Sequence, residues 1–255
     1  MIGLELLRSP ARQAGAVRQA EHRPWPLPER PWLLGQTVND VLLAHWRVPA
    51  AQLRALLPEG LEPDLHQGEA WLSMTPARLA SVRLRGTLPV PRVSGALEVG
   101  VRTYVTADDR PGVWLFSVDV SSALAAEAGR RLLGLPLHRA RMSTRRRAGW
   151  VEYESARGDA PRPFVLSGRF RASGPVEVPE PGSLEHFLVE RFCLYVPSRS
   201  GPPRRAEMHH AVWPLQPAEA ELELNTMAPD GLGAGAEEPL LHFVGRHDLL
   251  LWAPT

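Results

Sequence analysis

The chain has 255 residues, a net charge of +1 and 44% apolar residues, a balance that supports a sizeable core and argues against wholesale disorder. The near-neutral charge gives no global field that would draw the protein to nucleic acid or to anionic lipid. All 29 basic residues are arginine, so the chain holds no side-chain amine that could form a Schiff base.

The single cysteine, the length of the apolar runs and the N-terminal segment indicate the cellular compartment that we expect for the protein. Cys193 lies in the apolar run 192–194, so no intramolecular disulfide can form and we expect a buried thiol in a reducing, cytoplasmic setting. No apolar run approaches about 18 residues, which predicts no membrane span. We see no signal peptide. Residues 1–22 are expected to form a frayed or helical leader, and residues 23–255 a single domain.

Two segments precede the centre of the chain. Residues 41–48 have the pattern of a strand, with His45 and Arg47 on one face. Residues 77–96 mix arginines with prolines and glycines, and we predict an irregular loop over one end of the fold. The sequence leaves open whether this loop closes over a pocket.

The stretch 98–142 organises the rest of the chain. Its first part, residues 98–105, alternates between valines on one face and Glu98, Arg102 and Tyr104 on the other, as a strand does. A turn at 108–112 leads into a second, more apolar strand over 113–120. Next comes a helix, with Ser121 or Ser122 as its cap and Gly134 at its end, and then a polar strand over 138–147.

The remaining elements complete the predicted architecture. Ser183 can cap a short helix, residues 218–224 alternate cleanly between alanine or leucine and glutamate, and residues 240–252 supply closing strands. Many strands, two or three helices and one core predict an α+β protein dominated by an antiparallel sheet that closes into a barrel.

The polar face of the central strand supplies the candidate ligand-binding residues. Arg102 is a candidate clamp for a carboxylate, with the alternative that it pairs with Glu98 or Asp119. Burial would make Glu98 a candidate general base, and otherwise it is the partner of an arginine. Tyr104, His45 and Asp119 are candidates to contact the same ligand, although a tyrosine is more often simply packed.

Other chemistries have weaker support. His45, His138, His209 and His210 come from separate segments without zinc-motif spacing, so we predict no metal and no cofactor. Arg139–Arg147 is more typical of a solvated strand than of a nucleic-acid site, because no aromatic platform accompanies it. No serine has the G-x-S-x-G context of a hydrolase.

The chain resembles the YqjF-like family, a family of unknown function also called DUF2071. The resemblance covers about residues 23–253 and rests on ordered blocks, among them RPWPLPERPWLLGQTVNDVLLAHWRVP, LPEGLEPDLHQGEAWLSMTP, RPGVWLFSVD, GLPLHRARM and PGSLEHFLVERFCLY. Gly100 departs from the family pattern, which usually has asparagine there.

The family is grouped with acetoacetate decarboxylase-like proteins, so the resemblance implies an antiparallel barrel or cone around a cavity, with two or three flanking helices. Those decarboxylases carry a Gly-Tyr-Pro-Lys-Lys motif, which Gly134–His138 resembles in position. Leu137 stands where the Schiff-base lysine would be and His138 at the next position, while Glu98 is similar to the pocket glutamate. Schiff-base decarboxylation is therefore excluded.

Together these observations predict a cavity that binds a small molecule, which we expect to be anionic, and they predict binding of neither nucleic acid nor a membrane. If the protein is an enzyme, we expect lyase- or isomerase-type acid–base chemistry with Glu98 and His138 as catalytic candidates. The alternative is a non-catalytic binding or sensing module with the same cavity. Self-association through an edge strand is compatible with the sequence, which gives no oligomeric state.

Overall fold

The strands form a 13-stranded sheet whose main path runs β1-β3-β4-β5-β10-β11-β13-β12-β9-β8-β7. This arrangement is seen in a computed structural model that describes residues 2–158, 162–198, 201–232 and 237–255. Short strands β2 and β6 pair with β4 and β5 at the margins of this path. The fold is mainly antiparallel β, as the sequence predicts.

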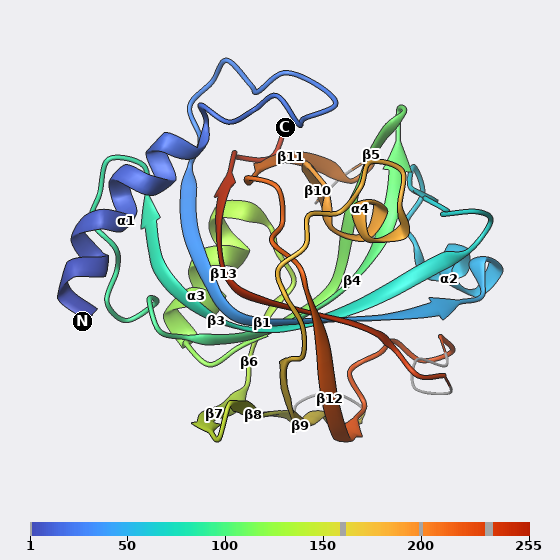
Figure 1. The fold of residues 1–255 in the computed structure, drawn as a ribbon. Coiled ribbons are helices and arrows are strands. Elements are labelled where there is room, and N and C mark those ends of the chain that lie inside the picture. The colour runs from blue at the N-terminus through green and yellow to red at the C-terminus, as the bar shows by residue number, and fades with distance from the viewer. Residues whose placement is uncertain (1, 159–161, 199–200, 233–236) are drawn as a thin grey trace.

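Seven strands close into a barrel (Figure 1) because β1 pairs with β3 on one side and with β13 on the other. His45 of β1, for example, lies opposite Ser73 of β3 and opposite Leu240 of β13. The barrel strands are antiparallel except where β5 meets β10. They are β1 (Leu34–Val48), β3 (Ala70–Leu84), β4 (Leu97–Ala107), β5 (Arg110–Val120), β10 (Cys193–Val196), β11 (Arg204–His209) and β13 (Leu240–Leu251).

The other long strands form a second layer, which lies beneath the barrel in Figure 1. It joins the barrel where Gln216 of β12 pairs with Phe243 of β13. A core of apolar side chains from both layers fills the space between them, including Val99 and Val101 of β4. Both faces of β4 are therefore covered, one by this core and the other by the barrel interior. The strands of this layer are β7 (Arg141–Arg147), β8 (Trp150–Arg157), β9 (Phe164–Ala172) and β12 (Gln216–Asn225).

The helices are short and lie around the barrel. Ser122 caps α3, where its hydroxyl accepts from the Ala125 N–H at 3.2 Å, and Gly134 ends that helix at φ 70°. Ser183 caps α4 in the same way through His186. Within the described part of the chain, no helix is long and apolar enough to cross a membrane. The helices and marginal strands are α1 (Ile2–Ala16), α2 (Ala50–Leu56), α3 (Ala123–Leu133), α4 (Leu184–Val189), β2 (Glu62–Pro63) and β6 (Leu137–Arg139).

The predicted loop over 77–96 is wrong for its first half. Strand β3 continues to Leu84, and its residues pair with β1 as far as Leu34. The arginines of this segment hid the strand pattern. Arg83 is buried because its guanidinium donates to the Gln13 side chain at 2.7 Å and to the Pro10 carbonyl at 2.9 Å, both from α1. Strand β1 is likewise longer than predicted.

Candidate functional site

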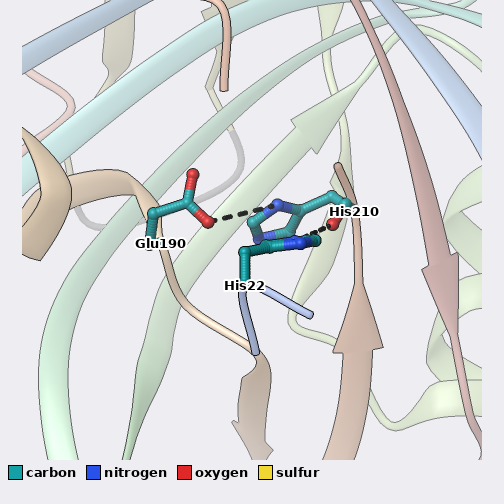
Figure 2. A group of neighbouring side chains, drawn as sticks. All are labelled: His22, Glu190 and His210. Atoms are coloured by element: carbon teal, nitrogen blue, oxygen red, sulfur yellow. Dashed lines mark hydrogen bonds and ion pairs between the residues drawn. The ribbon is translucent and has the colours of Figure 1, made fainter. Parts of the chain in front are cut away.

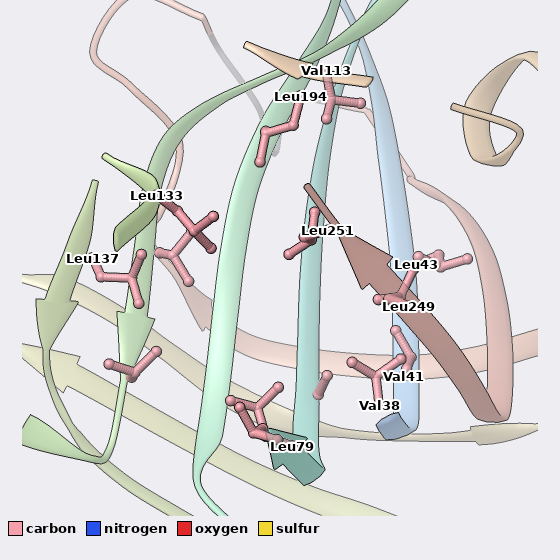
Figure 3. Close-up of a cluster of buried hydrophobic side chains, with 14 of the residues drawn as sticks. Val38, Val41, Leu43, Leu79, Val113, Leu133, Leu137, Leu194, Leu249 and Leu251 are labelled. Carbon is pink, nitrogen blue, oxygen red and sulfur yellow. The ribbon is translucent and has the colours of Figure 1, made fainter. Parts of the chain in front are cut away.

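The barrel interior contains a cavity of about 370 Å³ between its strands and helix α3. Most of its lining is aliphatic. Figure 3 labels ten of these side chains, which come from five barrel strands, β6 and α3: Val38, Val41, Leu43, Leu79, Val113, Leu133, Leu137, Leu194, Leu249 and Leu251. Its charged and amide- or hydroxyl-bearing side chains are Gln36, Thr75, Arg83, Glu98 and Arg102. A volume of this size is within the range of small-molecule sites.

Arg102 lines the cavity from β4 and lacks an ionic partner. Its Nε and Nη2 atoms are buried without a hydrogen-bond partner, and among the described residues neither Glu98 nor Asp119 forms an ion pair with it. Buried donor atoms without an acceptor are costly, whereas a bound carboxylate would accept from Nε and Nη2 in a bidentate way. The geometry at these two nitrogens therefore suits an anion.

Glu98 lies on the same face of β4 as Arg102, with Gly100 between them. Burial raises the pKa of the Glu98 carboxyl to about 7. Gly100 keeps this part of the cavity open, since a Cβ there would approach Thr75 Oγ1 to 2.9 Å. A carboxyl with a pKa near neutrality can take up and release a proton at physiological pH, which is the property of a general acid–base group.

A buried polar cluster lies next to Arg102. His45 Nδ1 is 2.6 Å from Ser73 Oγ, which is 2.6 Å from the Tyr104 hydroxyl. Burial, together with the nearby charge of Arg102, holds the pKa of His45 well below its ordinary value, so the imidazole is neutral. Ser73 pairs across the sheet with both His45 and Arg102. His45 and Tyr104 do not belong to the cavity lining and form a layer beside it.

Two predicted residues lie away from the cavity lining. Asp119 forms an ion pair with Arg157 of β8, with Arg157 Nε and Asp119 Oδ1 2.8 Å apart, on the side of the second layer. His138 pairs with Asp119 in the parallel register of β5 and β6. Leu137, the neighbour of His138, does line the cavity, so an apolar side chain stands at the position that the resemblance assigns to a lysine.

Some residues that sequence reasoning missed contribute to the site. Ser73 and Thr75 alternate on β3, and this period of two was the signal that could have placed both beside the cavity. Arg191 lies with its guanidinium carbon 5.1 Å from the centre of the Tyr104 ring. No local pattern points to Arg191, because it reaches Tyr104 from a segment distant in sequence.

A second polar cluster comprises His22, Glu190 and His210 (Figure 2). Its geometry favours protons over a metal ion. Both ring nitrogens of His210 face carbonyl oxygens, of Ala211 at 2.8 Å and of Arg191 at 3.0 Å, and His22 Nε2 faces the His210 carbonyl at 2.8 Å. Burial holds the pKa of His210 well below its ordinary value, so the neutral ring carries one proton, and the nitrogen that holds it donates to a carbonyl and cannot bind a metal. The other ring nitrogen faces the second carbonyl too closely for an ion to lie between them.

We expect the protein to melt at the same temperature after dialysis against EDTA and after addition of Zn²⁺. The reason is that both ring nitrogens of His210 lie against carbonyl oxygens, so coordination through either nitrogen would force the buried ring out of its contacts. Differential scanning calorimetry is the measurement, with His22→Gln as the matched variant. A melting temperature that rises with Zn²⁺ in the wild type and not in His22→Gln would contradict this expectation.

Comparison with known proteins identifies a matching protein family and a relative that is similar over most of the sequence. A family model described as DUF2071, uncharacterized conserved protein, matches residues 35–248. The uncharacterized protein YqjF of Bacillus subtilis (strain 168) is 36% identical over 231 residues, which cover 89% of this chain and 93% of YqjF.

Solved structures share the fold. The acetoacetate decarboxylase of Legionella pneumophila superposes with a TM-score of 0.61 at 16% identity, covering 94% of both chains. An acetoacetate decarboxylase-like enzyme from Sphingomonas wittichii RW1 gives 0.61 at 20% identity, covering 92% of this chain and 96% of its own. The enduracididine biosynthesis enzyme MppR, complexed with pyruvate, gives 0.60 at 15% identity, covering 91% and 92%. At these identities the likeness establishes the fold alone.

Proposed function

This chain belongs to the DUF2071 family of uncharacterized conserved proteins, and on that premise we propose that its barrel cavity binds a carboxylate or keto acid. The guanidinium of Arg102 carries the proposal, because its buried Nε and Nη2 atoms have no hydrogen-bond partner within the described part of the chain and a carboxylate could accept from both. MppR, which has the same fold, binds pyruvate, and this adds support for an acid as the ligand.

Glu98 is the group that would act on the bound acid. Its carboxyl, with a pKa near 7, would remove a proton from a carbon next to the ligand's carbonyl and return it, which is lyase- or isomerase-type acid–base chemistry. A covalent route through a Schiff base is excluded, because the chain has no lysine and Leu137 lines the cavity at the corresponding position.

The binding step is tested by thermal denaturation with a panel of small carboxylic acids, keto acids and neutral analogues. An acid at about 100 times its Kd should stabilise the native state by roughly 2.7 kcal/mol. For a chain of this size that is a rise in melting temperature of about 5 to 10 °C. We expect the rise with acids only, in the wild type and in the exposed-arginine control Arg145→Met, and not in Arg102→Met. The same rise in Arg102→Met would remove Arg102 from the site.

The alternative is a non-catalytic binding or sensing module, supported by the predominantly aliphatic lining. Incubation of keto acids with the protein in D₂O separates the two, because proton removal exchanges the hydrogen on the carbon for deuterium. An enzyme with Glu98 as base exchanges faster as the pH rises through about 7, and Glu98→Gln abolishes this exchange. A binding module shifts the melting temperature and leaves exchange at the protein-free rate.

A further inference from the structure

The cavity has a polar end and an apolar end. Along β3, Ser73 pairs with Arg102, Ala77 pairs with Glu98, and Leu84 lies at the opposite end of the strand. The guanidinium therefore lies at one end of the cavity and Glu98 lies between it and the end marked by Leu84. Glu98 and Arg102 are four positions apart along β4, which separates their Cα atoms by roughly 13 Å. The two side chains therefore serve different parts of one ligand.

The end near Leu84 is open to solvent. Four side chains line the cavity and are also exposed, by 38% for Leu84, 37% for Val90, 50% for Leu124 and 48% for Leu132. These residues, which we call the apolar rim, come from the end of β3, the segment after it and helix α3. The mouth through which a ligand enters is therefore apolar, which favours a ligand with an apolar body over a short polar acid.

The walls between the two ends are aliphatic. The cavity lining includes side chains such as Leu79, Val118, Leu133 and Leu249. Besides Arg102 at one end and Glu98 between the ends, the charged and amide- or hydroxyl-bearing lining side chains are Thr75, Gln36 and Arg83, and Arg83 already donates to groups of α1. A ligand of two or three carbons would leave most of this apolar surface without contacts, and an aliphatic chain would cover it.

We infer that the ligand is a medium-chain aliphatic monocarboxylate, held with its carboxylate on Arg102 and its chain lying along the aliphatic walls toward Glu98. At roughly 30 Å³ per water-sized atom, a cavity of about 370 Å³ holds about a dozen non-hydrogen atoms. That is the size of a saturated or keto acid of eight to ten carbons. The inference rests on the proposed carboxylate clamp and adds the chain as the second determinant of recognition.

The test is a calorimetric titration with straight-chain acids from acetate to dodecanoate, each below its micelle concentration, and with the primary alcohols of equal length. Burial of one CH₂ should lower Kd about fourfold, up to eight to ten carbons, beyond which the gain stops. The heat capacity of binding should become more negative with each added CH₂. One acid should bind per chain.

A variant in the wall gives an independent measure of chain length. Ala128 of α3 lines the cavity and Ala123 of the same helix is exposed and does not. We expect Ala128→Phe to shift the optimum toward shorter acids, and Ala123→Phe to leave it unchanged. Since the wild-type series already gives the chain-length dependence, a loss of folding in Ala128→Phe would not remove the test.

The outcomes separate this inference from the proposed function. Equal affinity for acetate, butyrate and octanoate, lost in Arg102→Met, would overturn the medium chain and leave the carboxylate clamp in place. Equal affinity for octanoate and octanol would overturn the clamp and the monocarboxylate with it. Binding of many acids per chain without saturation, as a detergent binds, would also overturn the inference, and so would no binding across the series.

Discussion

Arg102→Met is expected to stabilise the ligand-free protein by about 2 kcal/mol, the order of the penalty for a buried group left without its partner. The wild-type side chain places a charge against the cavity wall with Nε and Nη2 unsatisfied, whereas methionine fills similar volume without that penalty. Urea denaturation at pH 6, where Glu98 is protonated, measures the change. The same variant should lose the stabilisation that acids give the wild type.

The sign of this effect separates a binding residue from a structural one. An arginine that only held the fold together would destabilise the protein on removal, because its partner would be left unpaired. Arg145 on strand β7 is exposed and serves as the control, and Arg145→Met should change stability by less than about 0.5 kcal/mol. A loss of stability in Arg102→Met, with acid binding retained, would assign Arg102 to the scaffold.

Much of the fold could be predicted because period-two alternation is a local property of the sequence. Glu98, Arg102 and Tyr104 share a face of β4 as the alternation predicts, and the helix between Ser122 and Gly134 follows from its two end residues. Leu137, which the resemblance of Gly134–His138 to the decarboxylase motif singles out, lies on the cavity lining.

Alternation assigns the residues of a strand to two faces, but it does not predict which face packs against a core and which faces a cavity or solvent. For β4 the answer depends on the second layer, whose core receives Val99 and Val101, so that Glu98 and Arg102 face the cavity. The pairing of Asp119 with Arg157 depends on the same layer and joins segments that no local pattern connects. The partners of a side chain are set by packing between distant segments, and a single sequence holds little of that information.

The Glu98→Gln variant is expected to stabilise the protein by about 3 kcal/mol at pH 8 and by almost nothing at pH 4.5. The carboxyl ionises near 4.5 in the unfolded chain and near 7 in the folded protein. Between these values the folded state binds more protons than the unfolded state, so stability falls as the pH rises, and the full penalty of about 1.36 kcal/mol per pKa unit is present above pH 7. Glutamine carries no charge and removes this dependence, which urea denaturation across the pH range measures.

Glu190→Gln is the matched control that connects this stability effect to the site. Burial also raises the pKa of Glu190 to about 7, so its variant should show a pH-dependent gain of the same sign. Glu190 lies outside the cavity lining, however, and its variant should bind acids as the wild type does. In the wild type and in Glu190→Gln, acid affinity should fall above pH 7, because ionised Glu98 repels a second carboxylate in the same cavity. In Glu98→Gln the affinity should stay level across pH 7, and a fall there equal to that of the wild type would show that Glu98 and the bound acid do not share the cavity.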